Sequence, residues 1–178
     1  ELDRVDPNSR ELVLDTRDLH IDSVKTASAG SDDFRTTRFV LDRRDTELGS
    51  ALRIAMPRDA ARVRIAYATS PQASGLQWVQ PSQTVGQRSP FLFSQAQALH
   101  ARSMAPLQDT PWIRATYTAT LRVPAGLVAV MAAEGDAGNR RGQTTFHFRM
   151  PQPIPSYLLA LAVGDLEFQA IGPRTGVW

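Results

Sequence analysis

Short runs in which apolar and polar residues alternate make up most of this chain, and none keeps the spacing of a sustained amphipathic helix. The strictest alternation covers residues 62–69, and residues 112–123 repeat it with threonines and arginines on the polar side. A period of two sends successive side chains to opposite faces of a strand. Both runs therefore predict half-buried strands, and the threonine-rich face is typical of an antiparallel sheet with one face in water.

Further strands are predicted between clusters of turn-forming residues, at positions 12–14, 19–21, 38–41, 51–56, 90–97, 127–133, 144–150 and 157–168. The runs 127–133 and 144–150 indicate a hairpin joined by a polar turn over residues 134–142. Residues 70–88 are polar and predict a long loop, and residues 98–104 predict one or two helical turns. Pro151, Pro153 and Pro155 predict an extended connector, because proline cannot continue a helix. This succession of predicted strands, without a sustained helix, predicts an all-β domain.

The composition fits a globular protein with a core of useful size. Hydrophobic residues make up 42% of the 178 residues and charged residues 21%. No apolar run approaches the roughly 20 residues of a helical membrane span. The chain has no cysteine, which excludes disulfides and thiolate metal ligands. Because it opens with Glu1 and no signal peptide, we expect it to be a piece of a longer protein.

The formal net charge of +2 comes almost wholly from arginine, since Lys25 is the only lysine. Nucleic-acid-binding proteins usually gather their basic residues in a run or on one face. Here the arginines alternate with acidic and apolar residues along the predicted strands. This pattern favours solvated outer faces of strands, so no nucleic-acid partner is expected.

The residues of this chain contain no recognisable catalytic constellation. His20, His100 and His147 lie far apart, and the His-Glu-x-x-His zinc motif is absent. Neither a Gly-x-Ser-x-Gly elbow nor a phosphate-binding glycine loop occurs. We expect His20 and His147 to be structural and no metal to be bound within this chain.

Gln95 and Gln97 are the polar residues that a plain core strand does not explain. On a strand they share a face with Phe91 and Phe93, and an unpaired buried amide is costly. One alternative is that they satisfy backbone groups of a neighbouring loop. The other is that they line a cleft, where an amide oxygen can accept a hydrogen bond from a substrate ammonium group.

Ordered motifs along nearly the whole chain resemble the aminopeptidase N (gluzincin) family of zinc aminopeptidases, in its leukotriene hydrolase-like branch. They are PFLFSQAQALH at residues 90–100, QDTP at 108–111, RATYTAT at 114–120, PIPSYLLALAVG at 153–164, IGPRT at 171–175 and ELVLDTRDL at 11–19. Gln97 matches the leukotriene hydrolase and aminopeptidase B branch, whereas aminopeptidase N itself has glutamate there. The sequence departs from the usual Pro-Cys at Pro106-Leu107, which removes only a thiol.

The resemblance implies a mostly antiparallel, multi-sheet, saddle-like β-sandwich. It implies that residues 1–178 form a single all-β N-terminal domain, truncated at both ends, with zinc held by a catalytic domain that is absent here. By the same resemblance, Gln97 binds the free N-terminus of a peptide substrate, Gln95 lies beside it and Ala98 offers backbone contacts. Asp109, near Arg102, is expected to form a structural salt bridge or cap a turn, and Arg174 to dock the next domain.

The function implied is therefore that of a non-catalytic domain, inactive alone, which packs on its own catalytic domain and lines the peptide cleft. The whole enzyme would hydrolyse N-terminal amino acids from peptides with a zinc-activated water. It would be cytoplasmic, or periplasmic or secreted if a signal sequence was removed. The alternative is a stand-alone β-sandwich module for binding or adhesion, because such folds host many functions.

Overall fold

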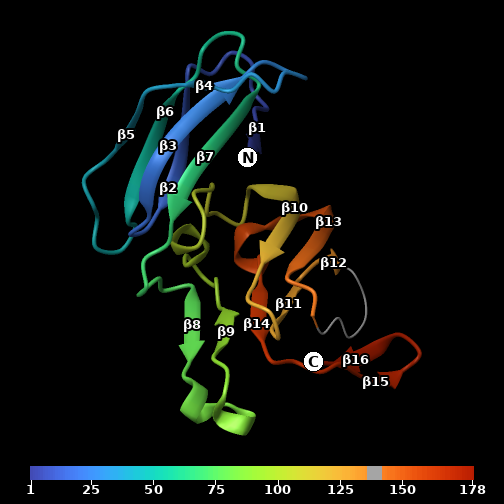
Figure 1. Ribbon diagram of the computed structural model, residues 1–178. Coiled ribbons are helices and arrows are strands. Elements are labelled where there is room, and N and C mark those ends of the chain that lie inside the picture. The colour runs from blue at the N-terminus through green and yellow to red at the C-terminus, as the bar shows by residue number, and fades with distance from the viewer. Residues whose placement is uncertain (136–141) are drawn as a thin grey trace. The chain divides into compact units, whose positions relative to one another are not determined.

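The computed structural model describes residues 1–135 and 142–178, which form antiparallel sheets with four short 3-10 turns (Figure 1). The chain divides into two compact units. Unit 1 comprises residues 1–74 and 99–109, and unit 2 comprises residues 75–98 and 110–178. Among the residues described, no helix is long and apolar enough to cross a membrane.

Unit 1 is built from two sheets, with strand orders β1-β7-β3-β4 and β2-β6-β5. The strands of these sheets are β1 (Leu2–Asp3), β2 (Glu11–Thr16), β3 (His20–Ala27), β4 (Arg35–Thr36), β5 (Phe39–Leu41), β6 (Ser50–Ala55) and β7 (Arg62–Ala68). Leu14, Leu52 and Ile54 of one sheet and Val24 and Val63 of the other share one buried core. The two sheets therefore form a sandwich whose inner faces carry the alternate apolar residues of each strand.

The described residues of unit 2 form three sheets, ordered β10-β13-β12, β11-β14-β9-β8 and β15-β16. The first two are built from β8 (Leu76–Val79), β9 (Phe91–Ser94), β10 (Arg114–Arg122), β11 (Val128–Met131), β12 (Glu134–Gly135), β13 (Thr145–Pro155) and β14 (Leu161–Gly164). A final hairpin joins β15 (Gln169–Gly172) and β16 (Thr175–Val177). Val128 and Ala129 of β11 pack with Phe146 and Phe148 of β13 in a second core.

The expectation of a mostly antiparallel, multi-sheet all-β fold is confirmed, and every strand pairing among the described residues is antiparallel. Residues 62–68 form β7, with Val63 buried and Arg64 exposed, as the alternation predicts. Within the run 112–123, residues 114–122 form β10, where Tyr117, Ala119 and Leu121 are less exposed than the threonines between them, while Ile113 and Ala115 of the predicted apolar face are exposed. The predicted helical turns appear as the 3-10 turn η3 (Ala101–Ser103).

The hairpin predicted between residues 127–133 and 144–150 is wrong. β11 pairs with β14, whereas β13 pairs with β10 along most of its length and with the two-residue strand β12. The chain bends at Ala132 and Ala133, which separates β11 from β12. The apolar run thereby finds its partner in a later apolar strand. Residues 136–141 of the predicted turn lie outside those described.

Three other predictions need correction. The loop predicted for residues 70–88 contains β8 and the 3-10 turns η1 (Pro81–Gln83) and η2 (Val85–Gln87). The proline connector is the second half of β13, where Pro155 is the register partner of Arg114. The single strand predicted for residues 157–168 is the turn η4 (Ser156–Leu158) followed by β14, and the hairpin β15-β16 comes after it.

Candidate functional site

Residues 95–98, here called the glutamine loop, follow directly after β9. The strand ends at Ser94, three residues before the predicted end, because the chain turns away from β14 at this point. The Ser94 hydroxyl accepts a hydrogen bond from the Leu161 amide of β14 at 2.9 Å. The Gln95 amide donates to the Gly75 carbonyl at 2.9 Å. These two bonds fix the entry to the loop within unit 2.

Gln95, Gln97 and Ala98 are all exposed, whereas Ala96 between the two glutamines is only 2% exposed. The Gln97 amide donates to Oε1 of Gln95 at 3.3 Å, and the peptide bond between Gln97 and Ala98 is cis. The two glutamines therefore lie in a loop, and not on one strand face with Phe91 and Phe93 as the alternation predicts. Gln95 satisfies a backbone group of its own loop, and the Gln97 side chain extends into solvent.

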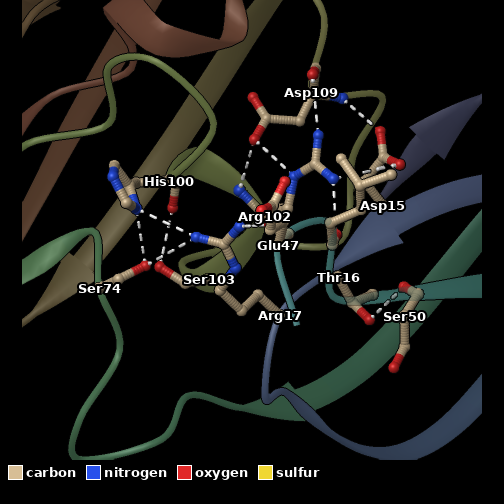
Figure 2. Close-up of polar contacts among 11 residues, drawn as sticks. Asp15, Thr16, Arg17, Glu47, Ser50, Ser74, His100, Arg102, Ser103 and Asp109 are labelled. Carbon is tan, nitrogen blue, oxygen red and sulfur yellow. Dashed lines mark hydrogen bonds and ion pairs between the residues drawn. The ribbon is translucent and has the colours of Figure 1, made fainter. Parts of the chain in front are cut away.

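A buried ion pair holds the segment that follows the loop in unit 1. The side chains of Arg102 and Asp109 are 5% and 0% exposed, and Arg102 Nε donates to Asp109 Oδ2 at 3.0 Å. Arg102 also donates through Nη2 to the Asp109 carbonyl at 3.1 Å and through Nη1 to the Leu48 carbonyl at 2.7 Å. Figure 2 shows the Arg102 guanidinium beside Asp109. The salt bridge expected for Asp109 is confirmed.

Asp15 of β2 completes this arrangement, which we call the arginine–aspartate cluster (Asp15, Arg102 and Asp109). The Asp109 amide donates to Asp15 Oδ2 at 2.8 Å, and Asp15 Oδ1 lies 3.7 Å from Arg102 Nη1 (Figure 2). The arginine thus faces carboxylates on two sides. The sequence does not predict a role for Asp15, because Asp15 lies between two predicted strands and is 94 residues away from Asp109.

Backbone hydrogen bonds extend the attachment along the free edge of β2. The Asp15 amide donates to the Leu107 carbonyl at 2.7 Å, and the Leu107 amide donates back to the Asp15 carbonyl at 3.3 Å. The Arg17 amide donates to the Arg102 carbonyl at 2.9 Å. Asp15 and Leu107 thus form an isolated antiparallel bridge at β2, which is an edge strand of its sheet.

A second set of polar contacts joins His100 to Ser74 and Arg17. His100 Nδ1 lies 2.8 Å from the Ser74 hydroxyl and 3.2 Å from Arg17 Nη1 (Figure 2). Arginine can only donate, so Nδ1 accepts and the ring proton sits on Nε2. Arg17 also donates through Nη2 to the Glu47 carbonyl, while its Nε is buried without a hydrogen-bond partner among the described residues.

The other residues singled out from the sequence lie apart from these contacts. His147 is exposed on β13, where Nδ1 lies 3.1 Å from the Thr120 hydroxyl, and exposed His20 contacts Asp22 at 3.2 Å. Arg174 is exposed in the turn between β15 and β16, and its docking role stays a prediction. Within residues 1–135 and 142–178, no three histidine or acidic side chains gather as a metal ligand set would.

Comparison with known proteins confirms the resemblance. Residues 4–158 match the family described as the peptidase M1 N-terminal domain. Leucine aminopeptidase 2 of Pyricularia oryzae is 38% identical over 98% of this chain, and leukotriene A-4 hydrolase of Xenopus laevis is 41% identical over 94%. The match covers 28% of each of those two proteins, so the chain spans under a third of their length.

Solved structures agree with the fold. The structure of native leukotriene A4 hydrolase from Saccharomyces cerevisiae superposes with a TM-score of 0.82 at 34% identity, over 98% of this chain and 26% of that one. The M1 zinc metallopeptidase from Deinococcus radiodurans has a TM-score of 0.64 at 22% identity over 93% of this chain and 38% of its own, which shows the fold alone. The chain belongs to the peptidase M1 N-terminal domain family.

Proposed function

We propose that this chain is the non-catalytic N-terminal domain of a zinc metallo-aminopeptidase that removes N-terminal amino acids from peptides. In that enzyme it packs on its own catalytic domain and lines the cleft that receives the free N-terminus of the substrate. The observation that carries the proposal is the family match over residues 4–158. The proposal is also supported by the small share of each relative that this chain covers, 28%, because the rest of such an enzyme would lie outside these residues.

The glutamine loop is the proposed point of contact with the substrate. A peptide's terminal ammonium group is a donor of hydrogen bonds, and the amide oxygen of an exposed glutamine accepts them. Gln97 is exposed and takes this role, while Gln95 supports it by accepting the hydrogen bond of the Gln97 amide. Ala98, also exposed, offers its backbone groups to the peptide.

The described residues do not fit a zinc site, because structural and catalytic zinc ions need three or four convergent nitrogen, oxygen or sulfur ligands. In the proposed enzyme, zinc is held by a catalytic domain beyond this chain. The contribution of this chain is confined to binding and orienting the peptide. A cytoplasmic location is part of the same proposal, tested by fractionation of cells that express the complete protein.

Gln97→Ala in the complete enzyme tests the role of the loop. Hydrogen bonds to charged groups contribute about 1.5–3 kcal/mol, so KM for aminoacyl substrates should rise roughly 10- to 100-fold. Because the ammonium group is bound in both the ground state and the transition state, kcat should change much less. The control is Gln83→Ala, since Gln83 is also exposed and also accepts a backbone hydrogen bond locally, from the Gln80 amide. Unchanged kinetics for Gln97→Ala would contradict the proposal.

The gene downstream of Trp178 gives an independent test. A Gly-x-Met-Glu-Asn stretch followed by His-Glu-x-x-His is expected there, because the second motif places two zinc ligands and a general base on one helix face. A stop codon directly after Trp178 would instead favour the stand-alone binding or adhesion module.

A further inference from the structure

We propose that β5 is a self-association edge, through which unit 1 binds unit 1 of a second copy of this chain. Each β5 adds itself to the sheet β2-β6-β5 of the other copy in an antiparallel pair, so that the two sheets continue across a two-fold axis. This inference concerns unit 1 alone and does not depend on the proposed function.

The first argument is the open edge of β5. The strand lies at the end of its sheet, and among the described residues it pairs with β6 only (Figure 1). The Arg38 carbonyl and the Asp42 amide, on either side of β5, are both hydrogen-bonded to β6 at 2.9 Å. Because backbone groups alternate in direction along an antiparallel strand, those of Phe39 and Leu41 point away from β6. Such an edge is a template for a further strand.

The second argument is the order of charges along this edge, which reads RFVLD over residues 38–42. In an antiparallel pair centred on Val40, Phe39 of each copy lies opposite Leu41 of the other, and their outward backbone groups exchange hydrogen bonds. Arg38 of each copy then lies opposite Asp42 of the other. Opposite charges across a strand pair are favourable, so the edge is complementary to its own copy.

The third argument is what β5 leaves exposed in the single chain. Val40 and Leu41 are 60% and 42% exposed, and Arg38 is exposed without an ion pair to any described residue. In the proposed register Val40 packs beside its copy, Leu41 beside Phe39, and Arg38 beside Asp42. Two exposed apolar side chains are thereby covered, and the arginine gains a carboxylate partner.

Asp42 can take this second partner. Its Oδ2 accepts a hydrogen bond from Arg53 Nε at 2.8 Å, and its side chain is still 36% exposed. An ionised carboxylate has two oxygens and can accept several hydrogen bonds. The existing ion pair with Arg53 therefore leaves Asp42 able to bind Arg38 of the second copy.

The edge strand β10 shows the opposite charge pattern. It also lies at the end of its sheet, and it is nine residues long. Arg114 and Arg122 stand at its two ends, so an antiparallel pair of two β10 strands would set arginine opposite arginine. Like charges directly opposite are destabilising, and charged side chains protect an edge against association. Self-pairing is thus favoured at β5 and opposed at β10.

The proposed contact is small, since β5 has three residues. Interfaces that bury less than about 1,200 Å² belong to weak, transient complexes. We therefore expect a dimer with a dissociation constant on the order of 100 µM, in rapid exchange with the monomer.

The test is sedimentation velocity of the complete protein over concentrations from about 1 to 500 µM, which span that dissociation constant. Arg38→Asp and Asp42→Arg each set like charges opposite one another in a self-pair. Each variant alone should therefore associate at least about tenfold more weakly than the wild type. An equimolar mixture of the two should associate as the wild type does, because every acidic position then meets a basic one.

Arg58→Asp is the matched control. Arg58 is also an exposed arginine of unit 1, but it lies outside the strands. The variant makes the same change of charge as Arg38→Asp and should leave association unchanged. A wild type that stays monomeric throughout overturns the inference, as does a mixture of the two folded charge variants that associates no more than either alone.

Hydrogen–deuterium exchange of the wild type locates the contact. The outward amides of Phe39 and Leu41 should exchange rapidly in the monomer and become protected as the dimer forms. Protection at every concentration would mean that another part of the complete protein covers β5, and would overturn pairing with a second copy. Association without any added protection at these amides would place the contact elsewhere and overturn it as well.

Should either charge variant fail to fold, Val40→Lys gives the comparison. Val40 is largely exposed, so the fold can accept lysine there, whereas the two-fold pair would bring two lysines side by side. Association should weaken at least about tenfold. Unchanged association of folded Val40→Lys contradicts pairing through β5. None of these outcomes involves Gln97, so the proposed function stands or falls separately.

Discussion

Tyr67, on β7, is a partly buried side chain that ties the stability of unit 1 to pH. Its hydroxyl donates to the Met104 carbonyl at 3.1 Å, and burial raises the pKa of the phenol above its ordinary value. The unfolded chain therefore loses this proton at a lower pH than the folded one. The contribution of Tyr67 is fully present below about pH 10 and is lost as the pH rises through the folded-state pKa.

Tyr67→Phe should accordingly flatten part of the fall in the free energy of unfolding as the pH rises above about 10. At pH 7 the same change should cost about 1 kcal/mol, because the hydrogen bond to Met104 is lost. Urea unfolding at a series of pH values measures both effects. An unaltered alkaline slope in the variant would show that the phenol of Tyr67 is not the source of the slope.

The sequence predicts the contacts of single residues correctly where the two partners are close together along the chain. Arg102 and Asp109 are seven residues apart, so a salt bridge at Asp109 could be expected. Asp15 could not, because only the folded chain brings β2 to residues 107–109. The glutamines were identified as unusual on a strand face, yet a period of two residues cannot show that β9 ends at Ser94.

At the scale of elements, the attachment of residues 102–107 to β2 should be visible as slow amide exchange. Leu107→Pro removes the amide that donates to the Asp15 carbonyl. We expect faster hydrogen–deuterium exchange at the amides of Asp15 and Arg17, which donate to this segment. Leu107→Ala keeps the amide and serves as the control. Equal protection of Asp15 and Arg17 in both variants would mean that the segment does not depend on this pairing.

The sequence predicts which face of a strand is buried, but it does not predict which strand pairs with it. The alternation in residues 62–68 reports which side chains are buried, and β7 has that burial. It carries no information on which strand lies beside it. β11 was therefore assigned to a hairpin with residues 144–150, although it pairs with β14 about 30 residues later. β8 was missed because four residues among prolines and glycines become a strand only when paired with β9.

At the scale of the whole molecule, the described chain has two hydrophobic cores, one in each unit. Every residue of the first cluster belongs to unit 1 and every residue of the second to unit 2. The chain passes between the units at three peptide bonds, after Ser74, Ala98 and Asp109. Damage to one core should therefore loosen its own unit first, because apolar contacts hold cooperative regions together.

Leu52→Ala tests this separation. Leu52 is 0% exposed in the core of unit 1, and truncation of such a leucine costs about 2–5 kcal/mol. Hydrogen–deuterium exchange should rise across β2, β3, β6 and β7, while β10 and β13 keep their protection. Val40→Ala, at a 60% exposed position of β5, should change neither unit. Phe148→Ala should produce the reverse pattern, since Phe148 lies in the core of unit 2. A matching rise in both units from either variant would mean that they unfold together, and that each core depends on the other.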